Sequence, residues 1–198
     1  MKYYLKSTVI PFLYLFFTAI TAIGFLGIEK LAGPFKLVIL FLNVGILLFI
    51  MGAFSFKHGE QAYKDLLAND VERRIMVENN VLRPLKLNEE YRPWKGFVMG
   101  ALPCIPLVVF MIPHLIVVIS GGSYQGFGYI ASFLYYSFLA FAEFFGSELT
   151  VYSYFWTLVA LPVLSLTSGI PYLMGARKAR IIEERILEQE KFIYGENK

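Results

Sequence analysis

Three polar side chains that could take part in chemistry stand inside long apolar stretches of the sequence. They are Asn43 in VILFLNVGILL, His114 in MIPHLIVV and Glu143 in FLAFAEFFG. An unpaired polar group in lipid costs several kcal/mol, so each of these side chains needs either a partner or a function. An imidazole and a carboxylate at membrane depth are typical of proton relays and solute pathways. His114 and Glu143 are therefore the candidate pair for such a site.

Each of the three residues also has a structural interpretation, and that is the one we favour. Asn43 can make an interhelical hydrogen bond that contributes about 1 kcal/mol. His114 follows Pro113, so its ring can bond a carbonyl that the proline leaves unpaired, or meet water near the outer face. Glu143 faces water if its segment lies along the membrane surface. A proton or substrate role is the alternative for His114 and Glu143.

Known catalytic motifs are missing from the sequence. There is no H-E-x-x-H zinc motif, no Walker A loop, no G-x-G-x-x-G and no G-x-S-x-G. The one cysteine, Cys104, excludes an intramolecular disulfide and a cysteine-only metal site. Because no nucleophile and base stand at a recognisable spacing, we expect a protein that is not an enzyme and that holds no cofactor and no metal.

Prolines and glycines indicate kinked and closely packed helices. Five prolines interrupt two apolar stretches: Pro103, Pro106 and Pro113 in residues 96–119, and Pro162 and Pro171 in residues 153–175. Each proline removes a backbone hydrogen bond and bends the helix. Transport sites use such broken helices, but we favour a kinked packing element. Gly96 and Gly100 form a G-x-x-x-G pair, which permits close contact between helices.

Composition shows which elements must position these residues. Of the chain, 57% is hydrophobic and 17% charged, whereas about a quarter of a soluble domain is charged. Four stretches contain no Asp, Glu, Lys or Arg: residues 7–28, 37–56, 96–142 and 149–176. About 20 helical residues cross a bilayer, and in lipid a helix satisfies its own backbone. The sequence therefore predicts an all-α, polytopic integral membrane protein with one membrane domain over residues 1–198.

Positive charge decides between two span counts. Four full spans, about 8–28, 36–56, 96–119 and 153–175, leave 16 of the 18 Lys and Arg on one side. The alternative of five spans, in which 129–147 also crosses, splits them 10 against 8. The positive-inside rule favours four spans in the cell membrane, with both termini cytoplasmic. Residues 129–147 are then a re-entrant or interfacial helix on the outer side.

Two polar segments lie on the basic side, the segment 57–95 and the tail 176–198. Each has a narrow apolar stripe at helical spacing: Tyr63, Leu67, Val71 and Ile75 in the first, and Ala179, Ile182, Ile186 and Ile193 in the second. We expect two amphipathic helices that pack on each other or lie on the lipid surface, with a protein partner as the alternative. Neither has the basic face that binds nucleic acid.

Aromatic and basic residues mark the end of the segment 57–95, and basic residues mark the beginning of the tail 176–198. In NEEYRPWKGF (88–97), Tyr91 and Trp94 suit the interfacial belt, and Arg92 and Lys95 suit the cytoplasmic side. Three cations follow the last span in the same way: Arg177, Lys178 and Arg180. We interpret these residues as topology anchors.

The function that we expect is that of a non-enzymatic subunit or accessory protein of a membrane complex. It would bind the lipid bilayer and either a partner protein or further copies of itself, through helix faces and the cytosolic segment. The first alternative is a small-solute transporter or permease component that uses the kinked helices 96–119 and 153–175. The second is a membrane enzyme that acts on lipid or peptide.

Overall fold

The computed structural model describes residues 2–26, 33–81, 84–85, 87, 89–145 and 152–195. Side chains in these ranges are described except at 2–8, 10, 25–26, 33, 141–145 and 194. Every regular element in the described part of the chain is a helix, and no strand occurs there. The all-α prediction is therefore confirmed.

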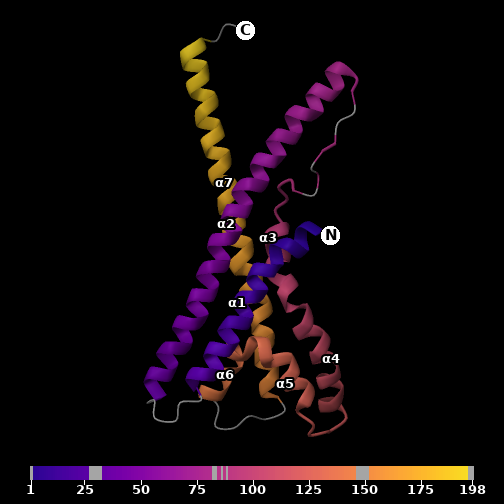
Figure 1. Ribbon diagram of the computed structural model, residues 1–198, viewed down its shortest axis with the longest axis vertical. Coiled ribbons are helices and arrows are strands. Elements are labelled where there is room, and N and C mark those ends of the chain that lie inside the picture. The colour runs from indigo at the N-terminus through magenta and orange to yellow at the C-terminus, as the bar shows by residue number, and fades with distance from the viewer. Residues whose placement is uncertain are drawn as a thin grey trace.

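The two longest helices cross like the arms of an X (Figure 1). α1 (Lys2–Leu26) runs towards one end of the molecule, and α2 (Gly33–Asn79) returns along its whole length. The 47 residues of α2 correspond to about 70 Å of helix, more than twice the thickness of the hydrocarbon layer. α2 ends before Asn80, whose φ of 54° is a left-handed conformation that stops a helix.

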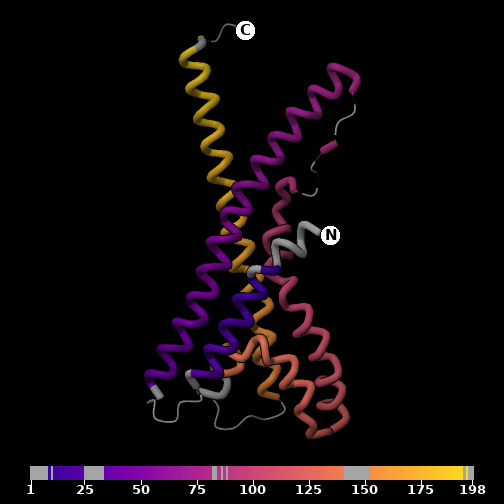
Figure 2. The backbone as a smooth tube through the Cα atoms, in the orientation of Figure 1, coloured from indigo at the N-terminus to yellow at the C-terminus, as the bar shows by residue number. Residues whose placement is uncertain are grey.

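The third apolar stretch is a helix with a break near its beginning. It consists of α3 (Lys95–Ala101), η1 (Leu102–Cys104) and α4 (Ile105–Ile119). Pro103 lies in η1 and Pro106 in the first turn of α4, where their missing N–H groups loosen the α-helical pattern. Figure 2 shows the backbone changing direction at this point. Pro113, by contrast, lies inside α4 without a break.

The next segment forms a bent pair of helices in place of one helix over 129–147. The pair consists of α5 (Gly126–Ser132), the 3₁₀ turn η2 (Phe133–Tyr135) and α6 (Tyr136–Phe145). The beginning of α5 and the finish of α6, which we call the outer ends of the pair, both lie at one end of the molecule. At this end α1 also finishes and α2 begins (Figure 1). The segment therefore turns back towards the end from which it started.

The last element extends far beyond the bundle. It begins as the 3₁₀ helix η3 (Ser153–Val159) and continues as α7 (Ala160–Tyr194), which has 35 residues. Pro162 falls in the first turn of α7, where proline is tolerated, and α7 remains continuous through Pro171. Beyond their crossing, the charged ends of α2 and α7 diverge (Figure 1). The predicted amphipathic helices thus contact each other only near the crossing.

Three helical stretches are long and apolar enough to cross a membrane. They are Pro34–Asn79, Lys95–Ile119 and Ser153–Ile193, with mean hydropathies of 2.7, 2.5 and 1.6 over their most apolar 18 residues. In α1, the apolar stretch with described side chains, Pro11–Gly24, is shorter.

The core lies in the apolar half of the molecule, where α2, α4 and α7 meet the bent pair and η3. Its centre contains large side chains that are fully buried, among them Leu47, Leu107, Tyr135, Tyr154 and Leu164. Because these residues come from five different elements, the core holds the bent pair firmly against the longer helices.

Candidate functional site

Asn43 joins three helices through hydrogen bonds. Its Nδ2 donates to the carbonyl oxygen of Thr18 in α1 at 2.8 Å, and to Oγ of Ser137 in α6 at 3.3 Å. Its Oδ1 accepts a hydrogen bond from Oγ1 of Thr21, also in α1, at 3.0 Å. Both ends of the amide are thus used within the protein. This geometry matches the interhelical role better than an open binding site.

His114 lies in a closed aromatic cluster. Its side chain is fully buried, and its ring meets the ring of Tyr154 edge-on, with centroids 5.3 Å apart. Phe155 packs against the same imidazole at 5.4 Å. The hydroxyl of Tyr154 donates to Oε1 of Gln125 at 3.1 Å. The cluster therefore fastens α4 to η3 and to the residue that precedes α5.

Gly128 allows α5 to approach this cluster. A Cβ at this position would lie 2.6 Å from the ring of Tyr154 and 3.0 Å from Cε1 of His114. No larger residue fits without moving one of these rings. The close approach of α5 leaves the imidazole enclosed by protein.

Glu143 lies in α6, and its side chain is outside the described residues. α6 packs against α1, α2 and η3, and α4, which carries His114, packs against α5 and η3. A pairing of the Glu143 carboxylate with His114 therefore stays a prediction.

Glu90 forms a buried polar contact that sequence reasoning does not find. Its side chain is 8% exposed and accepts hydrogen bonds on Oε1 from Nδ2 of Asn69, at 2.8 Å, and from the guanidinium of Arg73. Both donors belong to α2. The contact therefore ties the chain that leads into α3 to the charged half of α2.

Lys95 and Tyr91 add further contacts where the chain leading into α3 meets α2 and α7. Its side chain is buried, and Nζ donates to the carbonyl oxygen of Glu90. The backbone N–H of Tyr91 donates to the carbonyl oxygen of Ala62 at 2.9 Å. The ring of Tyr91 stacks on that of Tyr172 in α7, with centroids 5.6 Å apart, and burial raises the pKa of its phenol.

The remaining anchors differ from Lys95 and Tyr91, because they are exposed. Trp94 is 48% exposed, and Arg92 points to the surface as well. The three cations of α7, Arg177, Lys178 and Arg180, are also exposed. Lys178 lies 3.4 Å from Glu60 of α2, and Arg180 lies 2.8 Å from Glu184 one turn along α7.

Glycines permit two close helix contacts, only one of which the sequence indicates. In α3, a Cβ on Gly96 would lie 2.5 Å from Cβ of Tyr172, and one on Gly100 would overlap the carbonyl oxygen of Leu164. In α2, a Cβ on Gly59 would overlap the carbonyl oxygen of Tyr172. α7 is therefore held between α3 and α2. The sequence contains one indication of the contact at Gly59, which is its seven-residue spacing from Gly52. This spacing places both glycines on one face of α2.

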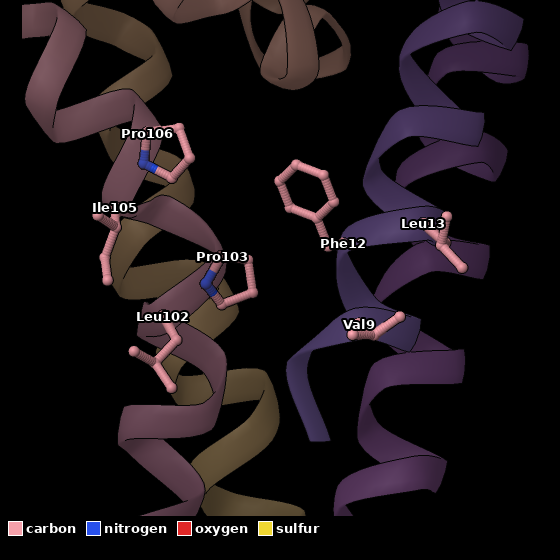
Figure 3. A pocket seen from close by; sticks show the side chains of 7 residues that line it. All are labelled: Val9, Phe12, Leu13, Leu102, Pro103, Ile105 and Pro106. Atoms are coloured by element: carbon pink, nitrogen blue, oxygen red, sulfur yellow. The ribbon is translucent and has the colours of Figure 1, made fainter. Parts of the chain in front are cut away.

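An apolar pocket of about 380 Å³ opens between α1 and the broken third helix. Figure 3 shows Phe12 of α1 pointing across the gap towards Pro103 and Pro106. The other lining residues are Val9, Leu13, Leu102 and Ile105. At the break, the hydroxyl of Tyr135 donates to the carbonyl oxygen of Pro103. The pocket has no polar side chain in its lining, so it suits hydrocarbon rather than a polar solute.

Within the described ranges, no group of three or more His, Cys, Asp or Glu is placed to hold a metal ion.

No protein family matches the chain, and comparisons with curated proteins and with solved structures also find no match.

Proposed function

We propose that the chain is a non-enzymatic subunit of a membrane complex that holds two rigid helical arms in the cytosol. Four spans cross the cell membrane in this proposal: α1, the first half of α2, α3 to α4, and η3 with the first half of α7. The bent pair of α5 and α6 enters and leaves on the outer side, and both termini are cytoplasmic. Two observations support this topology: the shared direction of the outer ends of α5 and α6, and the concentration of Lys and Arg on the opposite side.

The continuity of α2 and α7 carries the proposal. Both helices pass from an apolar half into a charged half without a break. We define the arms as residues 57–79 of α2 and 177–194 of α7. Close contact at Gly59 and Gly175 fixes the crossing of the two helices, since a Cβ on either glycine would overlap backbone of the other helix. A partner bound to the arms is therefore coupled rigidly to the spans.

The state of the polar groups inside the spans favours a subunit over a transporter. Asn43 uses both ends of its amide in bonds between helices, and the ring of His114 is enclosed. A solute pathway needs polar groups that converge on a space open to water. The pocket beside Phe12 is apolar throughout its lining.

Purification of the full chain tests this function. Membranes in which the chain is expressed at its native level are extracted with a mild detergent or directly into lipid nanodiscs. Light scattering then gives the mass of the particle, and mass spectrometry its composition. We expect a stoichiometric complex with another protein or with further copies of the chain. A monomer that carries no partner in either preparation would refute the proposal.

A transporter component is the second candidate, and the bent pair is the observation that favours it. An α-helix that is interrupted at membrane depth, as the third apolar stretch is at η1 and the bent pair at η2, is typical of helices that line substrate sites. This candidate predicts that the purified monomer binds or moves a small solute in liposomes. It also predicts that Glu143→Gln abolishes the movement, whereas Glu188→Gln, on the exposed arm of α7, leaves it unchanged.

A further inference from the structure

The outer part of α7 carries an apolar stripe that α2 does not cover. Ile182, Ile186 and Ile193 are 43%, 49% and 70% exposed, respectively. Nearer the membrane, the same side of the helix contacts α2 at Gly175, where a Cβ would overlap the carbonyl oxygen of Phe56, and Ala179 one turn further along is buried. The exposed stripe therefore continues an existing helix–helix interface beyond the point where α2 turns away (Figure 1).

The spacing of the stripe is that of a coiled coil. Residues 172, 175, 179, 182, 186, 189 and 193 alternate steps of three and four, which is the a and d pattern of a heptad. In this register Ile186 and Ile193 occupy a positions, and Ile182 and Gln189 occupy d positions. The first part of the pattern packs on α2, so the exposed seam extends from Ile182 to Ile193.

The direction of α7 excludes burial of this seam in the lipid surface. α7 is one continuous helix from its apolar half to Tyr194, and Figure 1 shows its end extending away from the bundle. To lie on the bilayer, the arm would need a break that the helix does not contain. A helix of another molecule is therefore the occupant that fits.

Charges beside the seam are complementary to those of a second, parallel copy. Arg185 occupies a g position and Glu190 the following e position. In a parallel coiled coil, a g residue faces the e residue five positions later in the partner helix. Arg185 of each copy therefore faces Glu190 of the other, which gives two opposite-charge pairs. Neither residue makes an ion pair with another described part of the chain.

An antiparallel pairing is unfavourable on the same grounds. It would place g positions opposite g positions and e positions opposite e positions. Lys178 would then face Arg185, and Glu183 would face Glu190, so that like charges meet. Two copies inserted in the same membrane also have their arms on the same side. Membrane insertion and charge therefore select the same direction.

We propose that the α7 arms of two copies form a parallel coiled coil through Ile182, Ile186, Gln189 and Ile193. This inference rests on the proposed function, because it names a second copy of the chain as the partner of the subunit. The seam covers less than two heptads and contains one polar residue, so it is weak in isolation. The membrane domains hold the arms side by side and raise their effective concentration. The test must therefore use the full chain in a membrane.

Cysteine cross-linking tests the seam directly. The native thiol is first removed by Cys104→Ser, and single cysteines are then introduced by Ile186→Cys, at an a position, or Glu188→Cys, on the opposite side of the helix. Facing a residues bring their Cα atoms to about 6 Å, within the range that a disulfide spans. Under mild oxidation in membranes, we expect a covalent dimer at position 186 and monomer at position 188. Equal cross-linking at both positions would overturn the proposal.

Charge exchange tests the register. Arg185→Glu alone and Glu190→Arg alone each place like charges opposite one another, so each should abolish the Ile186→Cys dimer. Co-expression of the two variants on separately tagged chains restores both opposite-charge pairs. We therefore expect the dimer to return as a heterodimer. Because both residues are exposed, neither variant should alter folding, and an unchanged unfolding temperature of each confirms this.

The outcomes separate this proposal from the function on which it rests. A stoichiometric complex with a different protein, without cross-linking at position 186, would overturn the coiled coil and retain the subunit function. A monomer without partner or cross-link would overturn both. A dimer that survives both single charge variants would overturn the parallel register proposed here.

Discussion

Gly59 permits the closest approach of α2 to α7, and its replacement by alanine tests whether that approach stabilises the protein. A Cβ there would overlap the carbonyl oxygen of Tyr172, closer than the 3.0 Å below which real Cβ contacts essentially never occur. Because the obstacle is backbone, it cannot rotate away, and the helices must separate. Gly45 lies in the same helix with open space at its Cβ position, so Gly45→Ala is the matched control.

The two substitutions should have opposite effects on the free energy of unfolding. Alanine is favoured over glycine inside a helix by about 1 kcal/mol, and overpacking costs about 1–3 kcal/mol. We expect Gly59→Ala to lower the free energy of unfolding by up to about 2 kcal/mol and Gly45→Ala to raise it by up to about 1 kcal/mol. At about 2–4 °C per kcal/mol, the combined difference of up to about 3 kcal/mol separates the two unfolding temperatures by at most roughly 6–12 °C.

Cys104 provides the assay. It is the only cysteine of the chain, and it is buried. A maleimide dye that fluoresces on reaction with a thiol therefore reports unfolding in detergent micelles. Both variants and the wild type are heated with the dye under identical conditions. Equal unfolding temperatures for the two variants would refute the inference that backbone contact at Gly59 determines how tightly the helices pack.

Three further predictions use the same assay. Glu90→Ala should lower the free energy of unfolding by about 1–3 kcal/mol, because it removes the carboxylate that accepts from the buried amide of Asn69 and from the guanidinium of Arg73. Glu78→Ala, at an exposed position, should change the free energy of unfolding little, and equal effects of the two substitutions would contradict the role of the buried carboxylate. Asn43→Leu should cost about 1 kcal/mol, since bonds between membrane helices are individually weak, and a stabilised variant would show that the bonds contribute nothing. Gly128→Ala should lower the free energy of unfolding by about 1–3 kcal/mol through overpacking against the aromatic cluster. An unchanged unfolding temperature would show that the rings of the cluster can move to make room for the added methyl group.

Local signals in the sequence account for the features that were predicted well. The absence of charge over each apolar stretch indicates helix, since only a helix satisfies its own backbone in lipid. The helix break at η1 coincides with Pro103 and Pro106, and α2 ends at Asn79, next to a residue type that adopts positive φ readily. Each of these effects acts within a few residues of its cause, so it can be recognised without knowledge of the fold.

Other features depended on residues far apart in the chain. Pro113 and Pro171 have the same chemistry as Pro103, yet both lie inside continuous helices. The hydrogen-bond partners of Asn43 lie 22 to 94 residues away along the chain. The spacing of residues along one segment contains no information about which helix passes beside it.

The sequence by itself determined that the chain is helical, where its apolar stretches lie and which end carries the positive charge, because these properties follow from composition over short distances. Only the tertiary structure decided which charges remain at the surface. A glutamate and a lysine in NEEYRPWKGF suit the cytoplasmic boundary of a membrane, yet both are buried: Glu90 accepts hydrogen bonds from two side chains of α2, and Lys95 donates to the carbonyl oxygen of Glu90. Burial of a charge is favourable only when partners converge on it from other elements, and the fold alone supplies that convergence.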